Sequence, residues 1–184
     1  VINGFFASEG GDREFNGLGT LMVSETVELQ RNPSKTKAEL EQIYKNFFRV
    51  TNVVWLGPGL ADDNQTFRGP IKGTNFFSSA GTGGHIDEFA RFVAADTILL
   101  AEVTEEERST VIGKATHINM EANYERLTRA RDQDGKPFKI VRIPLPSRTI
   151  AKSCVNNGDI YGYIKDLNFT DGTVIDTDCI TIVA

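Results

Sequence analysis

The sequence predicts an α/β fold in which short strands alternate with amphipathic helices. Apolar residues recur at steps of three and four along one stretch, which is typical of a helix with one buried face. Short β-prone runs bounded by glycine, proline and asparagine surround that stretch, which is typical of strands ended by turns. With 184 residues, 40% of them hydrophobic and 24% charged, the chain can build a core as one domain or as a piece of a larger one.

The first third of the chain predicts two strands, a helix and a third strand. Residues 2–8 are apolar and β-prone and run into a turn with two glycines. A second β-prone run, residues 19–24, closes a hairpin through Asn16-Gly17, a pair that favours tight turns. The helix begins at the capping-box sequence of residues 36–39, and a short buried strand follows at residues 53–56. The buried face of this helix consists of Leu40, Ile43, Tyr44, Phe47 and Phe48.

A long loop follows the third strand. Residues 61–84 carry glycine and polar side chains without periodicity, which predicts no regular element. Loops longer than about 12–15 residues are uncommon inside a compact domain and are more often functional than neutral. A lid that shapes substrate choice and a neutral surface insertion both fit this loop.

The second half of the chain predicts a strand, a helix, another strand and a β-rich end. The strands are expected at residues 97–102 and 139–143, and the helix between them from about residue 120 to 131. His117 lies in the polar stretch before this helix and is interpreted as a surface histidine. Residues 148–184 hold short β-prone runs and need no helix; these runs include 160–164 and 179–183.

Composition and spacing exclude several classes of partner. The net charge is −5 and the Lys and Arg residues are scattered, so no basic stripe indicates a nucleic acid partner. No apolar run approaches the roughly 20 residues that span a bilayer, so no membrane partner is expected. The two cysteines and two histidines lack metal-site spacing, so neither a metal nor another cofactor is expected, although one disulfide could form. A small cationic molecule suits the acidic balance.

Two clusters carry groups that could perform chemistry. In Glu9-Gly10-Gly11-Asp12 a carboxylate stands beside two glycines that let a ligand approach the backbone; a plain β-turn with a solvated acid is the alternative. In His85-x-Asp87, residues i and i+2 of an extended segment would point to the same face. Such a pair could transfer a proton and bind a cation, and a structural ion pair is the alternative.

Further motifs lie between these two clusters, and together they follow one order along residues 1–146. In this order they resemble agmatine deiminases and bacterial-type peptidyl-arginine deiminases, which are guanidine-modifying enzymes of the pentein superfamily. The motifs, besides Glu9-Gly10-Gly11, are Asn16-Gly17-x-Gly19-Thr20-Leu21, Gln30-Arg31-Asn32-Pro33, the capped helix, Val53-Val54-Trp55-Leu56 and Gly84-His85-Ile86-Asp87-x-x-Ala90-Arg91-Phe92.

The resemblance implies a partial pentein-type α/β propeller built of ββαβ-like modules. Residues 1–56 would form one module, 57–84 a long loop or insertion, 85–146 the next module, and 148–184 a β-rich extension. A five-module propeller needs more chain than 184 residues, so the sequence is interpreted as an internal fragment of a deiminase catalytic domain.

The resemblance also implies hydrolytic deimination of a guanidino substrate, with agmatine converted to N-carbamoylputrescine and ammonia. In such enzymes a cysteine thiolate attacks the guanidinium carbon, ammonia leaves, and water hydrolyses the covalent thiouronium intermediate. His85 matches the general acid and base of the family. Asp87 matches the carboxylate that binds the guanidinium, and Glu9 matches the acid that supports both the imidazole and the substrate.

The sequence departs from the family pattern at two points. The separation between Glu9 and His85 is longer than expected for the family, and residues 61–84 carry the surplus. Cys179 lacks the Gly-Gly-x-x-His context of the family nucleophile, so it is interpreted as a strand cysteine. The nucleophile is therefore expected outside this chain, which would be inactive alone. Peptidyl-arginine or another guanidino substrate, and a non-catalytic guanidinium-binding module, are the alternatives. Oligomer formation is compatible with the sequence.

Overall fold

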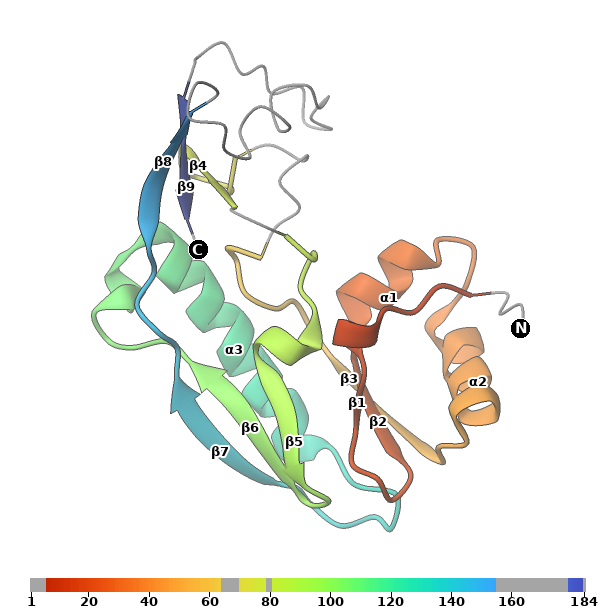
Figure 1. The fold of residues 1–184 in the computed structure, drawn as a ribbon. Coiled ribbons are helices and arrows are strands. Elements are labelled where there is room, and N and C mark those ends of the chain that lie inside the picture. The colour runs from red at the N-terminus through yellow and green to blue at the C-terminus, as the bar shows by residue number, and fades with distance from the viewer. Residues whose placement is uncertain (1–5, 64–69, 79–80, 155–178, 184) are drawn as a thin grey trace.

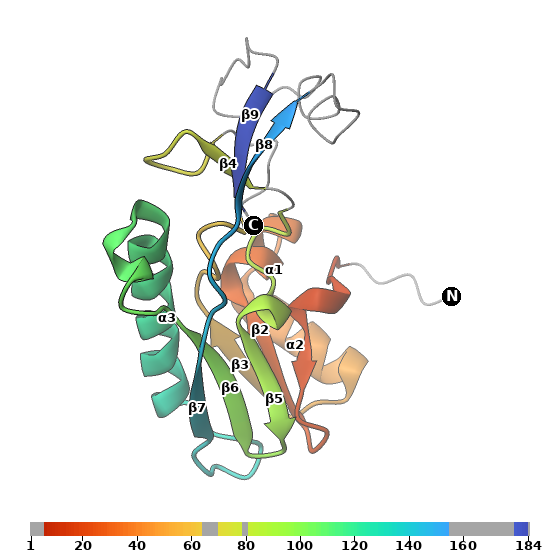
Figure 2. The same cartoon turned by 60° about the vertical axis from the view of Figure 1, so that its left-hand side comes forward.

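The computed structural model describes residues 6–63, 70–78, 81–154 and 179–183 (Figure 1). In this part of the chain the strands form three sheets of three strands each. Two of the sheets lie side by side with helices packed on them, and the third lies at one end of the molecule (Figures 1 and 2). No helix of the described part combines the length and the apolar surface needed to cross a membrane.

The first sheet belongs to a unit that starts with a hairpin. Its strand order is β1-β2-β3, with β1 antiparallel and β3 parallel to the central strand β2. The predicted hairpin through Asn16-Gly17 and the predicted strand before residue 57 are both confirmed. The elements are β1 (Glu14–Phe15), β2 (Thr20–Ser24), α1 (Glu25–Arg31), α2 (Lys37–Phe48) and β3 (Asn52–Leu56).

The helix α2 forms where the capping box predicts it. The side chain of Thr36 accepts a hydrogen bond from the Glu39 backbone, and the Glu39 carboxylate accepts one from the Thr36 backbone. The helix α1, in contrast, was not predicted, because the buried Glu28 interrupts its apolar face. The prediction of a strand over residues 2–8 is wrong for the described residues 6–8: the Asn32 side chain bonds both the N–H and the carbonyl of Ala7 in place of a neighbouring strand.

The second unit repeats the topology of the first. Its strand order is β5-β6-β7, again with an antiparallel pair followed by a parallel one. The strands at 97–102 and 139–143 are confirmed, but the helix begins well before residue 120. The Thr110 side chain caps this helix by accepting a hydrogen bond from the Gly113 backbone. The prediction missed the first turns because their residues have low helix propensity. The elements are β5 (Ala90–Ala94), β6 (Thr97–Glu102), α3 (Val111–Arg129) and β7 (Lys139–Pro144).

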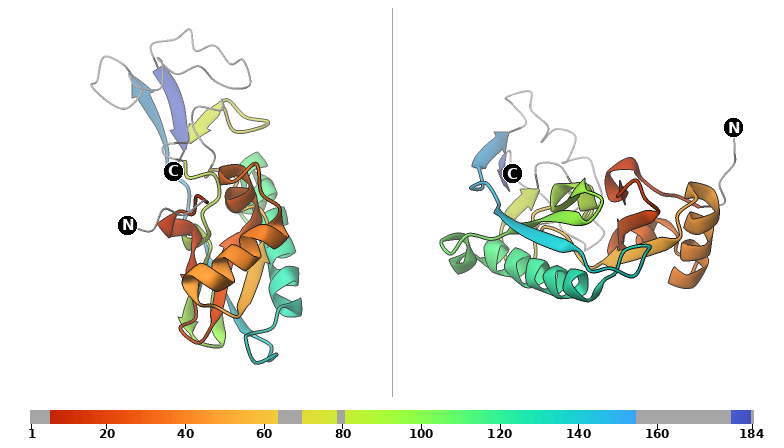
Figure 3. Two further views of the ribbon diagram at one scale, coloured as in Figure 1. Left: turned by 90° about the vertical axis from the view of Figure 1, so that its right-hand side faces the viewer. Right: turned by 90° about the horizontal axis from the view of Figure 1, so that it is seen from below.

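Both faces of the first sheet are buried, and one of them is shared between the units. Alternate residues of β2 point to opposite faces, so Leu21 and Val23 contact α2, whereas Met22 faces the core under α3. Viewed from two further directions, α3 lies along both sheets and α2 covers the far side of the first (Figure 3). The shared core is formed by Met22, Val54, Leu56, Ile86, Phe89, Ile98, Leu100, Met120, Leu127 and Phe138.

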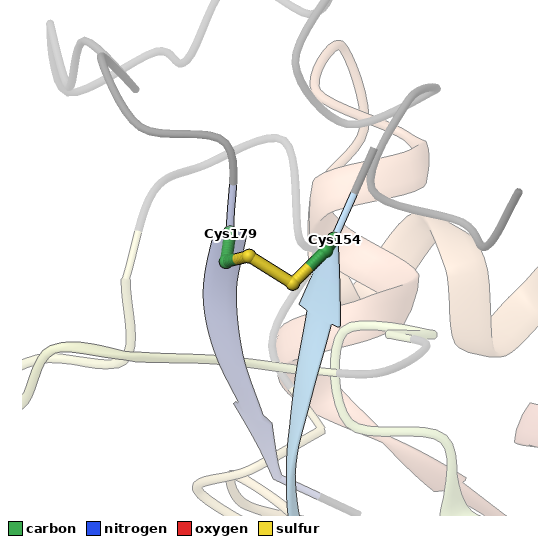
Figure 4. Close-up of a disulfide and its surroundings, with 2 residues drawn as sticks. All are labelled: Cys154 and Cys179. Atoms are coloured by element: carbon green, nitrogen blue, oxygen red, sulfur yellow. A yellow bond between two sulfur atoms is a disulfide. The ribbon is translucent and has the colours of Figure 1, made fainter. Parts of the chain in front are cut away.

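The third sheet joins two segments that lie far apart in the sequence. The strand β4 (Phe76–Ser78) pairs in parallel with β9 (Cys179–Val183), which pairs antiparallel with β8 (Ile150–Cys154). A disulfide links Cys154 to Cys179 at the cross-strand position (Figure 4). The prediction that residues 61–84 hold no regular element is therefore wrong, because a three-residue strand with a distant partner leaves no local signal. The predicted run 179–183 is confirmed; the predicted run 160–164 lies outside the described residues.

A buried arginine attaches this third sheet to the second unit. The side chain of Arg148, which is 10% exposed, bonds Asp62 at 2.7 Å and Glu107 at 2.6 Å. It also donates to the hydroxyl of Thr116 on α3 at 3.2 Å. The two carboxylates compensate the cost of burying the guanidinium. Beside them, Ile71, Ile112 and Val183 form a small apolar cluster.

Replacing both cysteines with serine should weaken the third sheet alone. A cross-link over a separation of 25 residues stabilises by about 2–4 kcal/mol, mainly through the unfolded state. We expect amides of β8 and β9 to exchange with solvent roughly 30- to 1,000-fold faster in C154S/C179S, as measured by hydrogen exchange. Amides of β2 and β6 serve as the control; an equal loss of protection there would contradict this local role.

Candidate functional site

Two of the predicted site residues, Glu9 and His85, are in direct contact. His85 Nε2 lies 2.5 Å from Glu9 Oε2 across 76 positions of sequence. Each residue directly precedes a short 3-10 helix, Gly10–Asp12 (η1) for Glu9 and Ile86–Glu88 (η3) for His85. The two short helices pack together where the first and second units meet, at the centre of Figure 1. The imidazole is largely buried, whereas the carboxylate is 41% exposed and accessible to a ligand.

Because Gly11 has no side chain, the side chains of His85 and Asp87 can both lie against its backbone. A Cβ atom at Gly11 would lie 2.5 Å from His85 Nδ1 and 2.9 Å from Asp87 Oδ2, so only glycine fits without displacing both side chains. The expectation that His85 and Asp87 project from an extended segment is wrong, because residues 86–88 are helical. The two side chains nevertheless meet, since both pack against the backbone of η1.

Arg31 is a charged group of the site whose role the sequence alone does not indicate. Its Nη2 donates to Glu9 Oε2 at 2.9 Å and to the carbonyl of Thr82 at 2.6 Å. The hydrogen bond from Arg31, together with that from His85, holds the pKa of the Glu9 carboxyl below its usual range. Because the carboxylate is ionised, it can only accept, so His85 Nε2 carries the proton in this contact. The motif Gln30-Arg31-Asn32-Pro33 contains this arginine, but no local pattern indicates its partner.

A buried pair of carboxyl groups lies directly behind the site. Asp12 accepts hydrogen bonds from the backbone of Ser24 at the end of β2 and from that of Ile86 in η3, the latter at 3.1 Å. Burial and the neighbouring Glu28 raise the pKa of Asp12 to about 9. Glu28 accepts hydrogen bonds from Ser8 and Tyr44. Burial raises the pKa of Glu28 as well, but the hydrogen bonds from Tyr44 and Ser8 lower it, so the proton of the pair is placed on Asp12, which donates to Glu28.

The arrangement can bind a planar cation beside a proton-transfer group. Asp87 is exposed, and within the described ranges its side chain has no hydrogen bond or ion pair. The Glu9 carboxylate contacts Nε2 of the His85 ring, and the Asp87 carboxylate lies with His85 Nδ1 close to Gly11. The ring can donate or accept a proton, and the carboxylates can bind a cation. In the described part of the chain no three His, Cys, Asp or Glu side chains are grouped to hold a metal ion.

Neither cysteine of the chain offers a thiolate to this site. Cys179 lies in β9, as the interpretation of a strand cysteine requires, and is bonded to Cys154. The sequence contains only these two cysteines. Any covalent chemistry by a thiolate at this site therefore needs a cysteine that these 184 residues do not supply.

Comparison with known proteins identifies relatives of the chain. The sequence profile described as Porphyromonas-type peptidyl-arginine deiminase matches residues 2–169. An agmatine deiminase of Pseudomonas aeruginosa is 27% identical over 143 residues, which are 77% of this chain and 33% of that protein. The chain spans about a third of the length of the curated relatives that it matches.

Solved structures show the same fold. A Porphyromonas gingivalis protein assigned as an arginine deiminase has a TM-score of 0.59 and 28% identity, over 77% of this chain and 36% of that one. The structure of an agmatine deiminase of Enterococcus faecalis has a TM-score of 0.62 and 24% identity, over 94% of this chain and 39% of that one. The mixed α/β architecture is therefore shared with these proteins.

Replacing Gly11 with alanine should disturb the site while leaving the fold intact. The added methyl group meets the ends of two side chains rather than backbone, so we expect a stability loss of about 1–3 kcal/mol and displaced His85 and Asp87 side chains. Gly10→Ala is a matched control, because its Cβ would meet only Arg13 at 3.9 Å. Imidazole NMR signals of His85 that shift in G11A and not in G10A would support this; equal shifts in both would contradict it.

The buried carboxyl pair should make the chain less stable as pH rises. Asp12 holds its proton in the folded state up to about pH 9 and loses it near pH 4 when unfolded, so the folded state binds the extra proton between these values. The stabilising contribution of Asp12 is largest below this window and falls across it, by up to about 1.4 kcal/mol per pH unit. Urea unfolding at several pH values measures the slope.

Two amide variants separate this linkage from packing. Asp12→Asn keeps Oδ1 as the acceptor for Ser24 and Ile86 and offers an amide donor to Glu28, so we expect a flatter pH dependence. Glu28→Gln places an amide N–H where the residue now only accepts, so we expect lower stability at every pH. A D12N variant that keeps the wild-type slope would rule out Asp12 as the titrating group.

Proposed function

The chain belongs to the Porphyromonas-type peptidyl-arginine deiminase family, and on that premise we propose that it supplies part of a site for the hydrolytic deimination of a guanidino substrate. The observation that carries the proposal is the contact between His85 Nε2 and Glu9 Oε2, beside the Asp87 carboxylate, which makes no hydrogen bond or ion pair among the residues that the structure describes. A proton-transfer group flanked by two carboxylates is what a guanidinium needs for binding and for loss of ammonia.

We further propose that the two repeated units are blades of a pentein-type α/β propeller. Each unit has a hairpin, a helix and a parallel strand, and the site lies between the two units, where the axis of such a propeller would run. In this assignment residues 1–56 and 85–146 are successive modules, 57–84 is an insertion, and 148–184 is an extension. The likeness to the solved deiminase structures supports this arrangement.

In the proposed reaction Asp87 and Glu9 bind the guanidinium through charge-assisted hydrogen bonds. A cysteine thiolate attacks the guanidinium carbon, and His85 gives its proton to the departing ammonia. His85 then takes a proton from the water that hydrolyses the thiouronium intermediate. Agmatine, converted to N-carbamoylputrescine, is the first candidate substrate, because curated relatives carry the name agmatine deiminase. The nucleophile is assigned to a residue outside this chain.

Two alternatives remain in the proposal. The substrate could instead be peptidyl-arginine or another guanidino compound, as the name of the matching family suggests. A non-catalytic module that binds guanidinium groups is favoured by one observation, the engagement of both cysteines in a disulfide. Deimination needs no cofactor for either substrate, because the thiolate, imidazole and water suffice.

Titration of the 184-residue chain with agmatine, measured by NMR, tests the binding step. We expect Asp87→Asn and Glu9→Gln each to weaken binding about 10- to 100-fold, because each loses hydrogen bonds to a charge worth about 1.5–3 kcal/mol. Glu125→Gln is the control, since that carboxylate is exposed on α3 and pairs only with Arg129 among the described residues. Putrescine, an amine without a guanidinium group, should bind more weakly than agmatine.

Three results would count against the proposal. Equal affinity for agmatine and putrescine would remove the guanidinium specificity. Unchanged binding in both D87N and E9Q would remove these carboxylates from the site. Release of ammonia by the chain alone would contradict the assignment of the nucleophile to a residue outside it. A separate outcome, tighter binding of N-acetylarginine amide than of agmatine, would select the peptidyl-arginine alternative.

A further inference from the structure

One buried carboxylate holds the turn that carries His85. Asp63, which is 6% exposed, accepts hydrogen bonds from the backbone of Thr82 at 2.5 Å, Gly84 at 2.6 Å and His85 at 3.2 Å. The Thr82 hydroxyl donates to the same carboxylate. Four donors thus converge on one side chain from a segment of four residues.

The turn needs such an acceptor because of its backbone conformation. Gly83 and Gly84 have φ angles of 91° and 103°, which turn successive N–H groups inward and away from any strand. Backbone N–H groups that converge in this way form an anion-binding nest. Gly84 is buried, so its N–H would be costly without an acceptor. The Asp63 carboxylate fills the nest and thereby fixes the start of η3.

The turn is also bonded from the opposite side, by Arg31. The Arg31 guanidinium donates to both the Glu9 carboxylate and the carbonyl of Thr82. The interactions therefore form a closed ring that runs from Glu9 through Arg31, Thr82 and Asp63 to His85, and back to Glu9. Without the Asp63 bonds, Arg31 still holds Thr82, and His85 is joined to the turn only by its N–H, which donates to the Thr82 hydroxyl at 3.1 Å.

A neighbouring carboxyl group, that of Glu88, also bonds the Asp63 acceptor. The carboxyl of Glu88 forms a hydrogen bond with Asp63, and desolvation together with this neighbour raises the pKa of Glu88 to about 7. A proton on Glu88 can be donated to Asp63 without disturbing the bonds from the turn. Asp63 itself makes no contact with Glu9 or with the exposed side of the imidazole in the contacts described.

We propose that Asp63 is a positioning residue that sets the imidazole of His85 against Glu9. It also joins the two ends of residues 64–81, because Asp63 precedes this segment and Thr82 follows it. The hydrogen bonds that hold His85 therefore lie where the two ends of this segment meet. The geometric part of the proposal stands on the described contacts, and only its relevance to deimination depends on the proposed function.

The imidazole proton of His85 provides a direct test in the 184-residue chain. The chain has two histidines, so nitrogen-15 imidazole spectra resolve His85 with His117 as the internal reference. We expect a slowly exchanging Nε2 proton in the wild type and its loss in Asp63→Asn, in which an amide N–H would face the turn's donors. Glu9→Gln should also perturb it. A merely destabilising substitution would leave this proton in place while the chain stays folded.

Asp62→Asn is the matched control. Asp62 precedes Asp63 in the chain and is half-buried, but its carboxylate bonds Arg148 and not the turn. We expect D62N to keep the His85 proton. A folded D63N that keeps this proton, or a D62N that loses it equally, would overturn the proposal.

A milder variant keeps the test decisive if D63N does not fold. Thr82→Val removes only the hydroxyl, which bonds Asp63 and accepts from the His85 backbone at 3.1 Å. We expect at least tenfold faster exchange of the His85 proton in T82V, and unchanged exchange would overturn the proposal. Agmatine titration of the wild type separates the two hypotheses. If the wild type does not bind agmatine but D63N loses the His85 proton, the proposed function alone is rejected. If the wild type binds agmatine but D63N keeps the His85 proton, the positioning role alone is rejected.

Discussion

The carboxyl group of Asp12 bonds the first and second units to each other through their backbones. It accepts from Ser24, where β2 ends, and from Ile86, in the first turn of the second unit. Because Asp12 is fully buried beside Glu28, this junction depends on a proton kept between two acids. Glu9 and Gly11 lie within three residues of Asp12, and Ile86 lies between His85 and Asp87. The positions of Glu9, Gly11, His85 and Asp87 therefore follow from this junction.

The two carboxylates of the site have different surroundings and can therefore do different things. Glu9 uses the same oxygen, Oε2, to contact both Arg31 and His85, which fixes its orientation and leaves Oε1 for a ligand. Asp87 is exposed and unengaged in the described part of the chain, so its charge is available to an incoming cation. One acid is thus held in place by the protein, and the other is left for the ligand.

Local patterns predicted much of the fold because the responsible interactions are local. The hairpin at Asn16-Gly17 and the capping box at Thr36 each involve neighbours in sequence, and both form as predicted. The helix α1 was missed because Glu28 occupies its buried face, and β4 because it spans three residues whose partner strand lies at the other end of the chain.

The same distinction applies to the site. Glu9, His85 and Asp87 belong to short motifs with recognisable chemistry, so the sequence could nominate them, and the structure brings them together. Arg31 and Asp63 could not be nominated, because their partners become neighbours only after the two units pack. Asp12 stood in a nominated cluster, but its pairing with Glu28 depends on the placement of α1.

The third sheet has a consequence for how the chain can change over evolution. Its strand β4 comes from the segment before His85, whereas β8 and β9 come from the far side of the second unit, and a two-stranded ribbon is at best marginally stable alone. Each segment is therefore useful only in the presence of the other. We expect descendants and shortened versions of this protein to keep both segments or to lose both, even though the two are separated in the gene by an entire structural repeat.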